Sequence, residues 1–330
     1  MGTGPGQMDG DRGYYAMPDK EGRILNDYIA IATAANHHIR AYAATTRLMV
    51  EQARRRHDTS PVVTAALGRL LTAAGMMGAL LKSEKETVTL RVNGSGPVGS
   101  LIAAADPEGN VKGYAGVNAV DLPPSEKGKL DVGRAVGIGV LSVTRDEGHG
   151  EPFTGTTQLV SGEIAEDLTY YFAVSEQTPS SVGLGVLMSP DNTVRRAGGF
   201  LIQLMPDVDE ETVDRLETRL RTVDSVTSML ERGMTPEDIL SYIFEGLGLE
   251  LMGTRPVRFH CGCSRKKTLR ILAGLDPKAL DEWVGKGLET EVVCEYCGER
   301  YTFSAREVLD ARAAHPAQSD GEESRTESGR

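Results

Sequence analysis

The sequence predicts an α+β protein with a large N-terminal α+β core domain, a helical acidic linker and a small C-terminal cysteine domain. Helical and strand-like segments do not alternate regularly along the chain, which disfavours a doubly wound parallel sheet. Stretches with apolar residues at three- and four-residue spacing stand apart from short runs rich in Val, Ile, Thr and Tyr. All four cysteines lie between positions 261 and 297.

Composition limits the classes of function. A chain of 330 residues is long enough for one large and one small domain. Its net charge of -11 disfavours a nucleic-acid binder, because such a protein needs a basic face. The N-terminus has no basic segment followed by an apolar core, so we expect no secretory signal and a reducing, cytoplasmic location.

The N-terminal part is expected to be a tail followed by helices. Residues 1–21 are rich in Gly, Asp and Pro and are predicted to be a mobile tail. Residues 24–57 carry a helical pattern, and Ser60-Pro61 is a typical start of a second helix. The apolar stretch 62–81 is about as long as a membrane span. It contains Arg69 and three glycines, however, which favours a helix buried in a soluble core.

From residue 87 the pattern is typical of strands. Thr87–Val92 alternates like a half-buried strand, and further short runs are separated by Gly and Asp-Pro. These runs are 101–104, 111–117, 137–144, 156–160, 183–188 and 199–204. Residues 22–205 are therefore predicted to form one α+β domain.

Residues 206–255 are predicted to form a helical linker. Twelve acids and four arginines give residues 206–250 a net charge of -8, most of the charge of the chain. A narrow apolar stripe runs along this segment, and Thr235-Pro236 with two following acids predicts the start of another helix. The stripe consists of Val213, Leu216, Leu220, Val223 and Leu230. Such helices are either plain surface helices or a segment that stays folded only while docked on its neighbours.

Residues 256–310 are predicted to form the cysteine domain, with a short helix that starts at Asp276-Pro277 and contains the only tryptophan, Trp283. Residues 311–330 are predicted to be a disordered tail. The cysteines read Cys261-Gly262-Cys263 and Cys294-Glu295-Tyr296-Cys297. This spacing lets four sulfurs converge on one tetrahedral ion, and Zn²⁺ is the usual occupant of such a Cys₄ site.

Three roles remain open for these sulfurs. The first is a purely structural zinc ribbon, which is the commonest use of such spacing. The second is a redox switch, which is favoured by the positive charges of Arg265, Lys266, Lys267 and Arg270, because nearby cations keep sulfurs as oxidisable thiolates. The third is a thiol-disulfide oxidoreductase that uses Cys294 and Cys297. That role requires a reactive CxxC at a helix N-terminus, and the neighbouring CxC argues for a metal instead.

Two further motifs carry little weight. Gly94–Gly99 matches G-x-G-x-x-G, but a strand and a turn follow it where a dinucleotide site needs a helix. We interpret it as a hairpin turn. His37-His38 lies in the helical pattern, where adjacent side chains point about 100° apart and cannot easily share an ion. No catalytic constellation is found, and the protein is expected not to be an enzyme.

The cysteine motifs, with the residues around them, resemble the heat-shock protein 33 family of bacterial redox-regulated holdase chaperones. The resemblance covers about residues 22–308. Besides the segments Phe259–Ser264 and Cys294–Tyr301, it rests on further segments in the family's order. These are Leu67–Leu71, Asn93–Pro97, Val111–Tyr114, Thr154-Gly155, Gly162–Asp167 and Tyr171–Gln177.

The resemblance implies a mechanism. Reduced protein would hold one Zn²⁺ per chain through Cys261, Cys263, Cys294 and Cys297. Oxidants would form the disulfides Cys261–Cys263 and Cys294–Cys297, expel zinc, unfold the linker and expose apolar surface. That surface would hold unfolding client proteins without ATP, and the core domain would bind clients and dimerise on activation. Clients would later pass to ATP-driven foldases, and neither nucleic acid nor membranes are expected as partners.

Overall fold

The structure is a computed structural model that describes residues 26–126, 128–275, 283 and 289–314. The chain divides into two compact units, residues 1–260 and 261–330. The expected N-terminal tail, the helix expected from Asp276 (apart from Trp283) and residues 315–330 lie outside the described residues. Helix α10 (Ala305–Ala314) continues through residues 311–314, which the sequence had assigned to the C-terminal tail.

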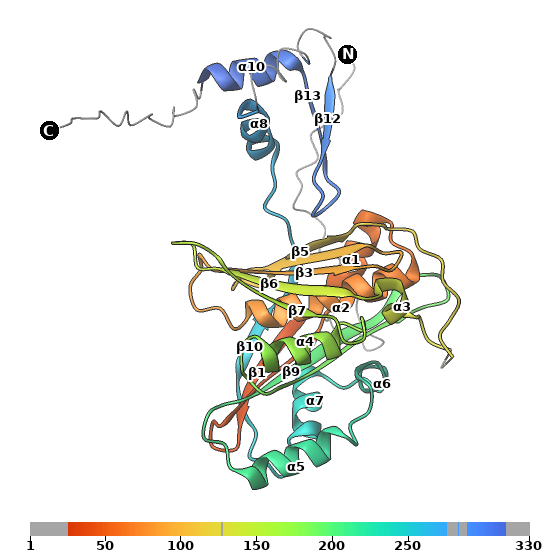
Figure 1. The fold of residues 1–330 in the computed structure, drawn as a ribbon, viewed down its shortest axis with the longest axis vertical. Helices are drawn as coiled ribbons and strands as arrows, with labels where there is room; N and C mark the ends of the chain where they lie inside the picture. The colour runs from red at the N-terminus through yellow and green to blue at the C-terminus, as the bar shows by residue number, and fades with distance from the viewer. Residues whose placement is uncertain (1–25, 127, 276–282, 284–288, 315–330) are drawn as a thin grey trace, which may run out of the picture. The chain divides into compact units, whose positions relative to one another are not determined.

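Two antiparallel sheets enclose a central helix in the larger unit (Figure 1). The five-stranded sheet has the order β10-β1-β2-β9-β8, and the six-stranded sheet has the order β11-β5-β4-β3-β6-β7, in which only β11 is parallel to its neighbour. The first sheet comprises β1 (Tyr28–Ala34), β2 (Ile39–Thr45), β8 (Ser180–Met188), β9 (Val194–Leu204) and β10 (Glu250–Pro256). The second comprises β3 (Thr87–Gly94), β4 (Ser100–Ala105), β5 (Asn110–Ala115), β6 (Gly139–Asp146), β7 (Phe153–Gln158) and β11 (Arg258–Phe259). The predicted α+β class and the strands β3–β9 are confirmed.

Helix α2 (Pro61–Gly78) lies between the two sheets and contacts strands of both. By length and composition it is the one helix in the described part of the chain that could cross a membrane, but 89% of it is buried inside the structure. This burial is what a core helix shows, as the sequence predicted. Before the acidic segment, the larger unit also contains the helices α1 (Arg47–His57), α3 (Val132–Val136) and α4 (Ala165–Val174).

The helical prediction for residues 24–57 is correct only for α1. Residues 28–45 form the hairpin β1–β2, which pairs Tyr28 with Thr45 and Ala34 with Ile39. His37 and His38 lie at its turn, where Ala35, Asn36 and His37 have positive φ. The predicted helix failed because the alanines of this stretch favour helices in isolation, whereas here the segment pairs as two strands of an antiparallel sheet.

The Gly162–Asp167 segment stabilises the entry to α4. The Asp167 carboxylate is buried and accepts hydrogen bonds from the backbone N–H groups of Val160, Ser161, Gly162 and Ile164 at 2.7–3.2 Å. Glu163 forms an ion pair with Arg69 of α2. Arg69 therefore has a charged partner at the partly exposed edge of the core, which explains how a charge is tolerated in so apolar a helix.

The acidic segment folds as three short helices, α5 (Glu210–Leu220), α6 (Val226–Glu231) and α7 (Pro236–Ile243). Each begins at a side-chain cap, from Asp209, Ser225 and Thr235 respectively. The predicted start at Thr235-Pro236 is confirmed, and the structure adds a capping box with Asp238. The end of the segment is not helical, because residues 250–256 form β10, the edge strand that pairs with β1.

Helices α6 and α7 pack on the five-stranded sheet. One face of this sheet carries Ala30, Ala32 and Ala34 of β1 and Ala41 and Ala43 of β2, all buried beneath apolar side chains of the acidic segment. Those side chains are Leu216, Val226, Met229, Leu230, Ile239, Leu240, Ile243 and Phe244. The small alanines let the helices approach the strands closely, and the face would be apolar if the helices left.

Candidate metal centre

The smaller unit brings the two cysteine pairs together. Cys261 and Cys263 precede helix α8 (Arg265–Ala273). The Ser264 side chain caps the N-terminus of this helix, because it accepts a hydrogen bond from the Lys267 N–H. Cys294 and Cys297 lie in the turn between β12 (Thr290–Val293) and β13 (Arg300–Phe303). The Cys294 carbonyl accepts from the N–H groups of Cys297 and Gly298 at 3.2 and 2.7 Å, which folds the turn back on itself.

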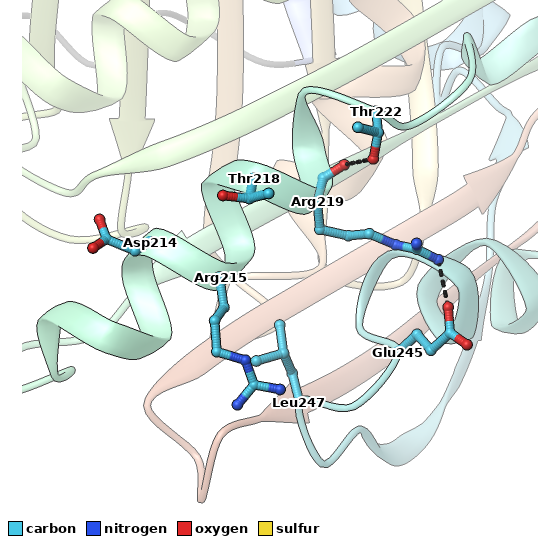
Figure 2. Close-up of a pocket in the computed structure, with 7 residues that line it drawn as sticks. All are labelled: Asp214, Arg215, Thr218, Arg219, Thr222, Glu245 and Leu247. Carbon is cyan, nitrogen blue, oxygen red and sulfur yellow. Dashed lines mark hydrogen bonds and ion pairs between the residues drawn. The ribbon is translucent and has the colours of Figure 1, made fainter.

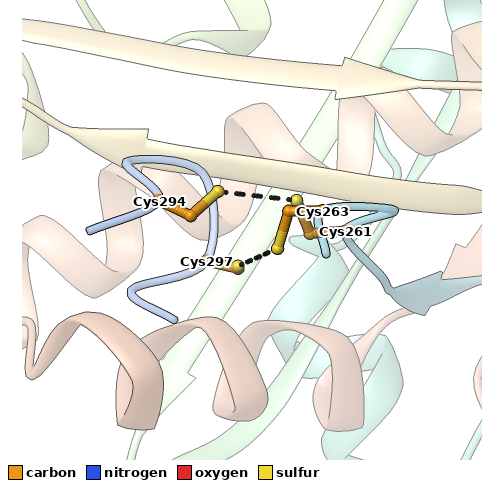
Figure 3. A group of neighbouring side chains, drawn as sticks. All are labelled: Cys261, Cys263, Cys294 and Cys297. Atoms are coloured by element: carbon orange, nitrogen blue, oxygen red, sulfur yellow. Dashed lines mark hydrogen bonds between the residues drawn. The ribbon is translucent and has the colours of Figure 1, made fainter. Parts of the chain in front are cut away.

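The four sulfurs form one cluster (Figure 3), and all of them lie within 4.8 Å of one another. The Sγ atoms of Cys261 and Cys294 are 3.8 Å apart, and those of Cys263 and Cys297 are 3.4 Å apart. Each of these contacts joins one pair to the other. Zn–S bonds of about 2.3 Å in a tetrahedron place sulfurs about 3.8 Å apart. The donor set therefore fits one tetrahedral ion bound by thiolates.

The electrostatics of the cluster also favour a cation. A hydrogen bond from the Cys297 thiol, together with those from the Cys263 backbone and the other sulfurs, lowers the pKa of Cys261 to about 5 despite burial. The same bond to Cys261, and burial, raise the pKa of Cys297. Burial, followed by the charge on Cys261, raises the pKa of Cys294. One thiolate thus suppresses ionisation of its neighbours, and all four can ionise together only around a positive ion.

Two of the four basic residues after the first pair, Arg265 and Lys267, contact groups other than the sulfurs. Arg265 pairs with Glu307 of α10, donates to the Thr302 carbonyl, and lies 4.7 Å from the centre of the Phe303 ring. Lys267 donates from Nζ to the Gly262 carbonyl at 2.6 Å. These contacts hold α8 against β13 and α10 and shape the CxC loop. The lowered pKa of Cys261 comes chiefly from the other sulfurs.

Tyr301 is a site residue that the sequence analysis did not single out. Its hydroxyl oxygen lies 3.2 Å from the Cys263 sulfur. Burial, followed by this contact, raises the pKa of the Tyr301 hydroxyl. Its position four residues after Cys297, on the strand that follows the cysteine turn, is the sequence feature that pointed to it.

The described residues of the smaller unit form a small apolar core. Within its described residues, Phe303 and Val308 are fully buried, and the partly buried Leu269, Leu272, Trp283, Val292 and Tyr301 pack against them. So little apolar burial is marginal for independent folding. A metal ion bound by four thiolates would supply much of the folding free energy of such a unit.

The other candidate motifs do not form sites. Gly94–Gly99 is the turn between β3 and β4, closed by a hydrogen bond from the Gly94 N–H to the Gly99 carbonyl, and no helix follows it. This confirms the predicted hairpin turn. His37 lies on the exposed β1–β2 turn. Its ring contacts the Thr33 hydroxyl, and its Nε2 lies 3.8 Å from a carboxylate oxygen of Glu250. Across the described ranges, the four cysteines are the one group of at least three potential ligand residues that could hold a metal ion.

The CxxC pair does not have the setting of an oxidoreductase. Cys294 and Cys297 lie between two strands, whereas a reactive CxxC is activated at the N-terminus of a helix. The close approach of Cys261 and Cys263 makes these two residues part of a four-sulfur cluster instead.

Comparisons with known proteins agree with this description. The family model described as Hsp33 protein matches residues 27–304. A protein from Lachnoclostridium phytofermentans named 33 kDa chaperonin is 54% identical over 87% of this chain and 98% of its own length. The 33 kDa chaperonin of Bacillus subtilis is 45% identical, with the same shares covered. The crystal structure of the 33 kDa chaperonin (heat shock protein 33 homolog) from Thermotoga maritima superimposes with a TM-score of 0.80 at 39% identity, covering 88% of this chain and 99% of that one. These are names of chaperones rather than of enzymes, as the sequence led us to expect.

Proposed function

Because the chain belongs to the Hsp33 family, whose members are chaperones, we propose that it is a redox-regulated, ATP-independent holdase. The observation that carries the proposal is the four-sulfur cluster in a unit whose described residues form a small apolar core. Such a unit depends on the cluster for its fold, so a chemical change at the sulfurs becomes a change in structure.

In the reduced state, Cys261, Cys263, Cys294 and Cys297 would together hold one Zn²⁺. A bound zinc ion would neutralise the four thiolates and cross-link the CxC loop to the β12–β13 turn. Zinc is favoured over other ions because four thiolates in a tetrahedral arrangement are its typical structural site.

Oxidation would release this constraint. An oxidant such as hypochlorous acid, or peroxide together with heat, removes two electrons from each pair of sulfurs and leaves disulfides that no longer bind the ion. We propose that the disulfides join neighbours, Cys261 to Cys263 and Cys294 to Cys297. The contacts in the reduced cluster run between the pairs, so this pairing requires the smaller unit to loosen first.

The acidic segment would act as the responsive linker. It holds a net charge of -8 and is fixed mainly by the apolar contacts of α6 and α7 with the alanine face of the five-stranded sheet. It leads through β10 and β11 to Cys261, so it is directly connected to the cluster along the chain. Its release would expose both its own apolar stripe and the alanine face, a surface suited to unfolding proteins.

The remaining parts of the proposal concern partners and place. Clients would be unfolding proteins, the activated form would be a homodimer, and ATP-driven foldases would take over the clients. The net charge of -11 is unsuited to nucleic acid, and the burial of α2 is that of a core helix rather than of a membrane span. The protein would act in the cytoplasm.

The proposal is tested by following zinc and thiols together. Reduced, zinc-loaded protein is treated with hypochlorous acid, and released zinc is read with a chromogenic chelator while free thiols are counted. We expect one zinc released per chain as all four thiols disappear, with peptide mapping that finds the two neighbouring disulfides. Retention of zinc with four intact thiols would instead favour a constitutive structural zinc ribbon.

A further inference from the structure

A tyrosine hydroxyl contacts one sulfur of the cluster. Tyr301 lies in β13, the strand that leaves the Cys294–Cys297 turn, and its hydroxyl oxygen is 3.2 Å from the sulfur of Cys263. Cys263 belongs to the other pair. The hydroxyl therefore links the hairpin of the second pair to a sulfur of the first.

The ring that carries this hydroxyl is held in place by the core of the smaller unit. Tyr301 packs with Phe303, the ring centres being 6.5 Å apart, and is the cross-strand partner of Val292. A hydroxyl fixed in this way is preorganised toward the sulfur and loses little entropy when it forms a hydrogen bond.

The chemistry of the pair gives the contact a direction. A sulfur that binds a metal ion as a thiolate carries no proton to donate, so the Tyr301 hydroxyl donates and the Cys263 sulfur accepts. A thiolate that accepts a hydrogen bond has lower electron density on sulfur. It therefore remains a ligand but becomes a weaker nucleophile toward oxidants.

We propose that Tyr301 is a positioning residue that restrains oxidation of Cys263 and so sets the oxidant threshold of the switch, an inference that rests on the proposed function. In the step concerned, the Cys263 thiolate attacks a peroxide. A sulfur–oxygen bond forms, the oxygen–oxygen bond breaks, and sulfenic acid and hydroxide result. A second cysteine thiol then displaces the sulfenic oxygen as water to form a disulfide. The hydrogen bond from Tyr301 stabilises the thiolate before this attack.

The test compares zinc-loaded full-length wild type with Tyr301→Phe, which keeps the ring and removes only the hydroxyl. Zinc release is followed with a chromogenic chelator under hydrogen peroxide at one fixed temperature, and separately under excess chelator with no oxidant. We expect Tyr301→Phe to bind one zinc and to release it under peroxide roughly three- to tenfold faster than the wild type. A change of this size corresponds to losing part of the free energy of one charge-assisted hydrogen bond. Release to chelator alone should change less.

Thr302→Val is the matched control, because it removes a hydroxyl from the next residue of the strand, which is exposed and points to the opposite face. It should behave like wild type. Equal rates of zinc release under peroxide for wild type and Tyr301→Phe would overturn this inference but not the proposed function. The same holds for an equal rise in the release rate with and without peroxide, and for failure of Tyr301→Phe to bind zinc. A wild-type protein that keeps its zinc under peroxide would overturn the proposed function itself.

Discussion

Single residues determine whether the cluster can form. All four cysteines contribute sulfurs within 4.8 Å of one another, so each is expected to be a ligand. Replacing Cys261 or Cys294 by Ser leaves three thiolates and should lower zinc affinity at least roughly a hundredfold, more than the loss of an outer contact. Competition with a chelator of known affinity measures this. Stoichiometric zinc with unchanged affinity in both variants would show that the sulfurs are not acting as one site.

A buried carboxyl in the core gives a prediction about pH. Asp27 precedes β1, and its carboxylate accepts from the Met49 N–H of α1 at 2.7 Å. It supplies the cap that the N-cap residue Thr46 lacks. Burial, opposed by hydrogen bonds from the first turn of α1 and by Arg47, raises the pKa of Asp27 to about 7.

The sign of this effect follows from proton linkage. The unfolded chain loses this proton near pH 3.9, whereas the native protein keeps it until about pH 7. The stability contributed by the shift is therefore fully present below about pH 4 and is lost as the pH rises toward 7. Asp27→Asn should abolish this decline.

Urea unfolding of reduced, zinc-loaded protein at pH 5 and pH 8 provides the measurement. The unfolding free energy of Asp27→Asn minus that of the wild type should be larger at pH 8 than at pH 5. Comparing the two proteins cancels the pH dependence of the cysteine unit, which they share. A gap that is the same at both pH values would mean that Asp27 is charged throughout.

At the scale of elements, the acidic segment is held by two kinds of contact. Apolar side chains of α6 and α7 cover the sheet, while arginines of α5 reach the end of α7 (Figure 2). Arg219 donates to the Tyr242 carbonyl and to Glu245, and its guanidinium lies 4.5 Å from the centre of the Tyr242 ring. Arg215 donates to the Gly246 carbonyl at 2.8 Å. Helix α5 buries only Leu216 and so depends on these contacts.

Arg219→Met should therefore loosen α5 in the reduced protein. It removes the charge and the hydrogen bonds while it retains an apolar side chain of similar length. We expect cleavage of residues 206–250 by a protease at limiting concentration to be roughly three- to tenfold faster, the scale of one or two such contacts. The control is Arg221→Met, because Arg221 pairs with Glu217 on its own helix. Equal cleavage rates for the two variants would mean that Arg219 does not secure the segment.

The elements also show which parts of the fold could be predicted. Strands β3–β9 were predictable because they alternate or end at Gly and Asp-Pro, and α2 because Pro61 starts a long apolar run. The hairpin β1–β2 was not, because its alanines favour helices in isolation and pack beneath α6 and α7 only in the folded protein. Strand β10 was missed because it carries no apolar pattern. It is an edge strand in which every residue is exposed or half-buried.

The candidate site was likewise predictable only in part. The clustering of the four sulfurs could be predicted from spacing alone, because two close cysteine pairs on either side of a small lobe are typical of a metal site. Tyr301 could not, since its role depends on where β13 places its hydroxyl relative to the other pair. Nor could the sequence show that Arg265 pairs with Glu307 instead of simply providing charge near the sulfurs.

For the whole molecule, the proposed function joins three parts of unequal stability. The larger unit has an extensive core around α2, the acidic segment rests on one apolar face, and the cysteine unit has two fully buried apolar side chains in its described part. Loss of the cluster should therefore unfold the weakest part first and leave the two sheets intact. Removal of zinc by a chelator under reducing conditions should loosen the cysteine unit without producing disulfides.

The measurement that tests the central claim most directly is light scattering of an unfolding client protein. The client is diluted from denaturant into reduced, zinc-loaded protein or into protein first oxidised with hypochlorous acid and freed of oxidant. The account predicts that only the oxidised form suppresses aggregation, without ATP, and that a thiol reductant with zinc returns it to the inactive state. Equal suppression by both forms, or none by either, would contradict a redox switch at the four cysteines.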